Sequence, residues 1–182
     1  MSRSTWDNMQ QSFASCMDPN TKQIKTLTYL EVCDRVSNVF EAMFMGLIAS
    51  QLKADIDNSS SNLKNGFLNH PENCDTIDTL LDFTLKKYGK EELRMDRASP
   101  IHGLLWSKRS VQFVVFYLDL LSKRPDLTAP ECAQQTYEIV LMPYHGWLTS
   151  KFASTVMGFS PVREDIYAKL VRLHESKNHL LA

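Results

Sequence analysis

Apolar residues recur at intervals of three and four along most of the chain, which is the spacing of one face of an α-helix. The first such run consists of Tyr29, Val32, Val36, Val39, Phe40 and Met43. A second run extends from about Ala49 to Leu63. Asn65-Gly66 predicts its end, because these residue types often close a helix. Between the two runs, Gly46 indicates a break or a point of close packing.

The second half of the chain predicts further helices with clear start and stop signals. Asp75-Thr76 offers a cap for a helix that Tyr88-Gly89 closes. A long helix is expected after Ser99-Pro100 and should end at Pro125. Pro130 fits the first turn of the next helix, because proline is tolerated there. Its apolar positions are Tyr137, Val140, Leu141, Tyr144 and Leu148.

The ends of the chain complete the prediction of the fold. After Ser160-Pro161 we expect a last amphipathic stretch that contains Ile166, Leu170 and Leu173. Residues 1–25 are polar and aperiodic, so we expect a polar N-terminal tail followed by one domain over residues 26–182. We find neither strand alternation nor internal repeats. The sequence therefore predicts an all-α protein with helices packed in layers.

Composition narrows the class of protein. The 182 residues are 43% hydrophobic and 23% charged, with a net charge of −1. A nucleic-acid-binding protein would need a clear basic excess, so we expect no such partner. The first 15 residues lack the apolar core of a signal peptide. The longest apolar-rich stretch, residues 40–49, is shorter than the ~20 residues that span a bilayer. We therefore expect a soluble cytoplasmic protein.

The motifs of common enzyme and metal sites are absent from the sequence. There is no P-loop, GxGxxG, GxSxG or HExxH pattern. The four cysteines are scattered and are expected to be reduced thiols. His70 and Cys74 share a loop, but two ligands fall short of the four that a structural zinc needs. We expect no catalytic activity, no metal and no cofactor.

Three segments carry a more specific pattern. The first is Lys53-Ala54-Asp55-Ile56, the second runs from Leu104 to Arg109, and the third is Tyr144-His145-Gly146-Trp147. Their order and separation resemble the glycolipid transfer protein family, and the resemblance extends over about residues 29–170. It implies a two-layer all-α sandwich with an apolar tunnel for lipid chains. It also implies non-enzymatic binding or intermembrane transfer of a sphingolipid.

The resemblance assigns roles to single residues. Asp55 would bind sugar hydroxyls and the ceramide amide N–H, because a carboxylate accepts several strong hydrogen bonds. Trp106 would be the plate on which the sugar ring stacks. His145 would donate a hydrogen bond to the ceramide amide carbonyl, a group that is costly to bury unpaired. Trp147 and Lys151 would contact the membrane.

Ser59 and Asn62 complete the expected headgroup site. They stand where glycolipid-type family members carry Asn and Lys. Both stay on the Asp55 side of the helix, because spacings of four and seven keep one face. The set of possible additional headgroup contacts is Asn58, Lys108 and Arg109.

The headgroup itself is predicted from two other positions. The branch of the family that takes ceramide-1-phosphate places basic residues where this chain has His102 and Trp106. A phosphate site favours permanent charge, preferably arginine. We therefore expect a neutral glycosphingolipid such as glucosyl- or galactosylceramide. Ceramide-1-phosphate transfer and a lipid sensor or adaptor of the same fold are the alternatives.

Each of these residues also has an ordinary structural interpretation. Asp55 could be a solvated surface carboxylate, and Trp106 and Trp147 could be core residues. His145 could be a buried histidine with its hydrogen bonds satisfied, and Lys108 and Arg109 could lie on a solvated face. A helical interaction module without a ligand would fit that interpretation.

Two departures from the family pattern lead to further expectations. Pro143 removes a backbone donor just before Tyr144-His145, so we expect it to kink the helix there. The family continues with further helices past the segment matching residues 165–170, and we expect them to be shortened here. We expect a monomer that contacts membranes transiently.

Overall fold

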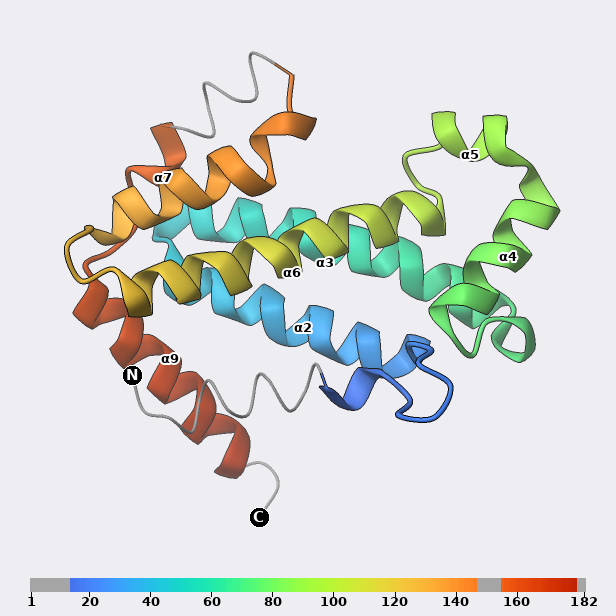
Figure 1. Cartoon of the computed structure of the whole chain (residues 1–182), viewed down its shortest axis with the longest axis horizontal. Helices are drawn as coiled ribbons and strands as arrows, with labels where there is room; N and C mark the ends of the chain where they lie inside the picture. Colours follow the sequence, from blue (N-terminus) through green and yellow to red (C-terminus); the bar gives the residue numbers. More distant parts are fainter. Residues whose placement is uncertain (1–13, 147–154, 180–182) are drawn as a thin grey trace. The chain divides into compact units, whose positions relative to one another are not determined.

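The computed structural model describes residues 14–146 and 155–179 (Figure 1). The described elements are α2 (Thr26–Met43), α3 (Gly46–Asn69), η1 (Pro71–Asn73), α4 (Ile77–Tyr88), α5 (Lys90–Met95), α6 (Pro100–Lys123), α7 (Ala129–Val140), η2 (Met142–Tyr144) and α9 (Arg163–His179). Extended pairing within these residues amounts to two isolated bridges. The all-α prediction is confirmed. No described helix is long and apolar enough to cross a bilayer.

The chain divides into two compact units. Of the described residues, unit 1 contains 38–53, 109–146 and 155–179, and unit 2 contains 14–37 and 54–108. The division falls inside α2, α3 and α6. Each unit has its own buried side chains.

Unit 2 is built around a cluster of apolar side chains from α3 and α4. Its buried members are Leu63, Phe67, Cys74, Ile77 and Leu80. The start of α4 is capped as predicted, because the Thr76 hydroxyl accepts from the Thr79 amide in a capping box. The start of α2 is fixed beside it, where the Thr26 hydroxyl donates to the Cys74 carbonyl at 2.8 Å. These bonds join the two helix starts within the unit.

The predicted polar tail ends in an ordered turn. Asp18 accepts hydrogen bonds from the amides of Asn20 and Thr21. The Lys25 amide donates to the carbonyl of the buried Cys16 at 2.8 Å. Residues 14–25 are therefore held by specific bonds, while residues 1–13 lie outside the described part of the chain.

The two glycines of the second predicted helix behave differently. Gly46 has a φ of +58° and separates α2 from α3, so the predicted break is confirmed. The predicted end at Asn65-Gly66 is wrong, because α3 continues to Asn69. A Cβ on Gly66 would lie 2.4 Å from Cγ of Pro100. Gly66 thus serves close packing rather than helix termination.

Unit 1 contains a column of aromatic rings. Phe40 of α2 and Phe44, directly after α2, pack against Phe113 of α6. Phe113 in turn stacks on Tyr117, with ring centroids 6.3 Å apart. The buried Tyr117 hydroxyl lies 2.9 Å from Ser160 Oγ. The Ser160 hydroxyl in turn donates to the Met43 carbonyl. Full burial of a phenylalanine side chain in this column contributes about 1.5–3 kcal/mol to folding.

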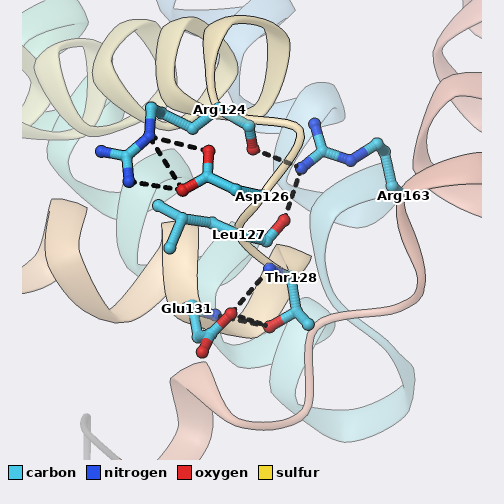
Figure 2. A network of polar contacts seen from close by, with 6 residues as sticks. All are labelled: Arg124, Asp126, Leu127, Thr128, Glu131 and Arg163. Atoms are coloured by element: carbon cyan, nitrogen blue, oxygen red, sulfur yellow. Dashed lines mark hydrogen bonds and ion pairs between the residues drawn. The ribbon is translucent and has the colours of Figure 1, made fainter.

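The loop between α6 and α7 is fixed by a polar network within unit 1 (Figure 2). Arg124 forms a two-pronged ion pair with Asp126. Thr128 and Glu131 form a capping box that starts α7. Arg163, at the start of α9, donates to the carbonyls of Arg124 and Leu127 at 2.9 and 2.6 Å. The predicted end of α6 before Pro125 and the start of α7 near Pro130 are both confirmed.

Two local features differ from the predicted helices. Residues 90–95, which lie outside the helices predicted from the sequence, form the short helix α5. The helix expected to run through Tyr144 ends at Val140, and Pro143 lies in the 3-10 turn η2 rather than in a kinked helix. Pro143 has no backbone N–H to donate. This is compatible with η2, because Pro143 lies in the first residues of the turn.

The network around Arg163 gives a prediction for stability. We expect Arg163→Ala to lower the free energy of unfolding by about 1–3 kcal/mol, because it leaves two carbonyls without their charged donor. Urea unfolding followed by circular dichroism measures this change. Arg172→Ala is the control, since Arg172 lies exposed on the same helix and donates to the Ala168 carbonyl within that helix. Equal effects of the two changes would contradict a role of Arg163 in fixing the loop.

Candidate functional site

The predicted headgroup residues of α3 lie along one partly exposed side of the helix in unit 2. Asp55 is exposed, while Ser59 and Asn62 are half-buried. The Ser59 hydroxyl donates to the Asp55 backbone carbonyl at 2.9 Å. The Asn62 side-chain amide donates to the Arg97 carbonyl at 3.3 Å, which links α3 to the loop before α6. The three side chains thus form a polar stripe.

A glycine brings α6 close to this stripe. A Cβ on Gly103 would lie 2.5 Å from the Ser59 carbonyl oxygen and 3.0 Å from Cβ of Asn62. One turn earlier on α6, Pro100 meets Gly66. The two contacts show that α6 and α3 run antiparallel here. The same register carries the backbone of α6 at Trp106, one turn after Gly103, toward the turn of α3 between Asp55 and Ser59.

A hydrogen bond on α6 orients the indole of Trp106. The Trp106 Nε1–H donates to Nε2 of His102 at 3.0 Å, and both side chains are half-buried. An imidazole nitrogen that accepts a hydrogen bond is unprotonated, so His102 is neutral in this pair. His102 is itself held at the helix start, where its amide donates to the hydroxyl of the buried Ser99.

Two residues outside the predicted set lie beside the predicted ones in the structure. Gly103 and His102 were not predicted to build the site. The spacing of four between His102 and Trp106 was the available signal, because such residues are neighbours on a helix. Asn58 and Lys108 are exposed on α3 and α6 of the same unit.

The remaining predicted contacts belong to unit 1. His145 follows η2 and is half-buried, with Nδ1 2.9 Å from the hydroxyl of the buried Tyr137. The Arg109 guanidinium lies 3.5 Å from the centroid of the Tyr144 ring, a cation–π contact. Burial, and secondarily the charge of Arg109, lower the pKa of His145. A neutral imidazole that accepts from Tyr137 through Nδ1 keeps its Nε2–H as a donor.

The other candidate chemistry is limited. Trp147 and Lys151 lie outside the described residues. Within the described part of the chain, no group of three His, Cys, Asp or Glu side chains is placed to hold a metal ion. All four cysteines are buried thiols outside any disulfide. Burial raises the pKa of Cys33 to about 11, so this thiol is a poor nucleophile near neutral pH.

The approach at Gly103 gives a prediction for packing. We expect Gly103→Ala to destabilise unit 2 by about 1–3 kcal/mol, because the added methyl overlaps the Ser59 carbonyl and forces the helices apart. Thermal and urea unfolding measure the loss. Gly146→Ala is the matched control, since its Cβ would meet no atom within 4 Å. Stabilisation of the Gly103 variant, as alanine gives in an uncrowded helix, would contradict the close approach.

The surroundings of His145 give a prediction for its titration. We expect its NMR titration midpoint to lie below the ordinary value of 6.5, since burial and Arg109 both disfavour the imidazolium. Arg109→Gln should raise the midpoint, whereas Lys123→Gln should leave it unchanged. The unfolded chain then binds the proton more readily, so His145 lowers stability as the pH falls below about 6.5. A wild-type midpoint at or above 6.5 would contradict this environment.

Comparison with known proteins identifies the family. The family model described as glycolipid transfer protein matches residues 24–172. Glycolipid transfer protein B of Xenopus laevis is 26% identical over 158 residues, covering 84% of this chain and 73% of the relative. Glycolipid transfer protein 1 of Arabidopsis thaliana is 24% identical over 142 residues, covering 78% of this chain and 67% of the relative.

Solved structures share the fold at low sequence identity. HET-C2, a fungal glycolipid transfer protein, has a TM-score of 0.70 and 22% identity, covering 89% of this chain and 80% of that chain. The mouse ceramide-1-phosphate transfer protein has a TM-score of 0.79 and 14% identity, and the match covers 89% of this chain and 78% of that chain. The likeness in fold and the match over most of the sequence agree, and the chain belongs to the glycolipid transfer protein family.

Proposed function

We propose that this protein binds a neutral glycosphingolipid and transfers it between membranes. Lipid transfer without catalysis is the activity of the family. The observation that carries the choice of headgroup is the polar stripe of Asp55, Ser59 and Asn62 on α3, against which α6 packs at Gly103, one turn before Trp106. A carboxylate beside an aromatic plate suits a sugar ring, which presents hydroxyls at its edge and C–H groups on its face.

The Trp106–His102 pair supports a sugar over a phosphate. His102 accepts the indole N–H and is therefore neutral, and Trp106 carries no charge. A phosphate monoester favours fixed positive charge at such positions. Asp55 adds a negative charge that would repel a phosphate but can accept hydrogen bonds from hydroxyls. The named relatives from Xenopus and Arabidopsis, both glycolipid transfer proteins, support the same choice.

Ceramide-1-phosphate is the second candidate ligand. The mouse ceramide-1-phosphate transfer protein and the human protein bound to 2:0 ceramide-1-phosphate have TM-scores of 0.79 and 0.77 with this chain. These values exceed the 0.70 of HET-C2. Because the identities are only 14% and 16%, the likeness concerns the fold and leaves the headgroup to the side chains described above.

The lipid chains explain why transfer needs a protein. Each CH₂ group exposed to water costs about 0.8 kcal/mol, so a two-chain lipid leaves a membrane very slowly by itself. We propose that the apolar tunnel of the family encloses the chains here. His145 would donate its Nε2–H to the ceramide amide carbonyl, a role that rests on the sequence resemblance and on its neutral state.

Membrane contact is proposed for the segment around η2. Ile139, Met142 and Tyr144 are 61%, 41% and 55% exposed, respectively, which is unusual for three large apolar side chains so close in sequence. Trp147 and Lys151 follow them directly and suit an interface where aromatic and basic side chains anchor. We propose a monomer that acts in the cytoplasm and contacts membranes transiently.

The headgroup proposal predicts the outcome of a vesicle transfer assay. We expect wild-type protein to move fluorescent galactosylceramide between vesicles and to leave fluorescent ceramide-1-phosphate near background. Trp106→Ala and Asp55→Asn should each lower the galactosylceramide transfer rate at least about tenfold. A tenfold change corresponds to the loss of roughly 1.4 kcal/mol of interaction free energy. Resonance energy transfer from the labelled lipid gives the rate.

Matched controls separate binding from folding. Leu105→Ala removes an exposed apolar side chain next to Trp106, and Asp78→Asn removes an exposed charge on α4. Both should transfer at the wild-type rate. If the protein transfers only ceramide-1-phosphate, the proposed lipid transfer activity is supported and the proposed sugar headgroup is contradicted. Absence of binding to either lipid would reject the whole proposal.

A further inference from the structure

Unit 2 contains a cavity of about 240 Å³ beside the headgroup stripe. Three asparagines of α3 line one side of it: Asn62, Asn65 and Asn69. Tyr88 of α4 and Glu92 of α5 line another part. We call this cavity the asparagine pocket.

The buried lining of the asparagine pocket is defined by fixed side chains. Thr84 and Ser99 are 3% and 1% exposed, and the Thr84 hydroxyl donates to its own helix at the Leu80 carbonyl. Gly66 also lines it, held against Pro100 by the close contact between α3 and α6. Asp96, another lining residue, accepts a hydrogen bond from the Ala98 amide at 2.8 Å. The pocket therefore has a preformed shape.

The polar groups of the pocket favour a neutral ligand rich in hydroxyls. Each asparagine can both donate and accept, and Glu92 and Asp96 add carboxylate acceptors. Tyr88 adds an aromatic ring, the usual partner for the apolar face of a sugar. The two carboxylates disfavour a phosphate or sulfate. The volume lies below the ~300–1,000 Å³ of sites for drug-sized ligands, which suits one ring-sized group.

Asn62 connects the pocket to the headgroup stripe. It lies seven residues after Asp55 on the same side of α3 and also lines the pocket. With a rise of ~1.5 Å per residue, Asn62 is about 10 Å along the helix from Asp55. Asn65 and Asn69 continue the stripe at helical spacing. The pocket is thus placed for a group attached beyond the ring held at Asp55.

We propose that the asparagine pocket binds the second sugar of the lipid headgroup. The ligand class is then a ceramide that carries at least two sugars, with the first ring at Asp55 and Trp106 and the second among the three asparagines. This inference rests on the proposed glycolipid function and narrows it to a substrate class.

The experiment compares two lipids that differ by one sugar. Dissociation constants for lactosylceramide and glucosylceramide are measured in the same vesicles with wild type and with Asn65→Ala/Asn69→Ala. The wild type should bind lactosylceramide more tightly. The double variant should weaken lactosylceramide about tenfold, as expected for two lost hydrogen bonds. Its affinity for glucosylceramide should stay within about twofold.

Two further variants keep the result interpretable. Tyr88→Ala alters the part of the pocket that α4 contributes, and it should cause the same selective loss of affinity for lactosylceramide. Ser61→Ala/Lys64→Ala alters exposed positions of α3 that do not line the pocket and should bind both lipids as the wild type does. Asn65 and Asn69 are exposed, so the double variant should melt at the wild-type temperature.

The outcomes separate this inference from the proposed function. Equal wild-type affinity for the two lipids, or equal loss of both in the pocket variants, overturns the second-sugar site and leaves glycolipid binding intact. A wild type that binds neither glycolipid overturns both. Selective loss of lactosylceramide in the asparagine and Tyr88 variants supports the proposal.

Discussion

The geometry of the headgroup site depends on the contact between α6 and the backbone of α3 at Gly103. Any larger residue would place a Cβ only 2.5 Å from the Ser59 carbonyl oxygen. This contact, with the one between Pro100 and Gly66, sets the register of the two helices. The register in turn directs the Trp106 turn of α6 toward the turn of α3 between Asp55 and Ser59, and Asn62 stands beside the loop before α6. Rigid helices therefore position both sides of the site, which favours precise geometry over the variability of loops.

The electrostatics of the site follow from one hydrogen bond on α6. By accepting the indole N–H, His102 has its Nε2 occupied and unprotonated, and the indole has its only polar group satisfied. The pair thus presents an aromatic surface without net charge. Such a surface gains little from binding an anion and much from binding a ring with both C–H groups and hydroxyls.

Much of the fold could be predicted because its signals are local. The cap at Thr76, the stop at Pro125 and the proline in the first turn of α7 depend on neighbouring residues alone, and the structure confirms all three. Gly66 was predicted wrongly for the opposite reason. Its local signal is a helix end, but contact with Pro100 of another helix requires a residue without a side chain inside α3.

The site shows the same limit. Helical periodicity sufficed to place Asp55, Ser59 and Asn62 on one side of α3, because that relation is internal to one helix. Gly103 could not be identified in this way, since its role exists only when α3 lies against it. The asparagine pocket is likewise formed by α3, α4, α5 and the start of α6 together. Its asparagines appear in the sequence as ordinary polar positions on an exposed helix.

The arrangement of the asparagine pocket suggests a reason why this chain has Asn62 where glycolipid-type family members carry a lysine. Lysine only donates hydrogen bonds and carries a charge, whereas asparagine donates, accepts and is neutral. A sugar hydroxyl also donates and accepts, so an amide can satisfy it in either direction. With Asn65 and Asn69 continuing the stripe and Glu92 and Asp96 nearby, the polar side of the pocket offers acceptors without fixed positive charge. Under the proposed function, an amide in place of the cation favours hydroxyl-rich, uncharged ligands over anionic ones and would extend the surface that such a ligand can use.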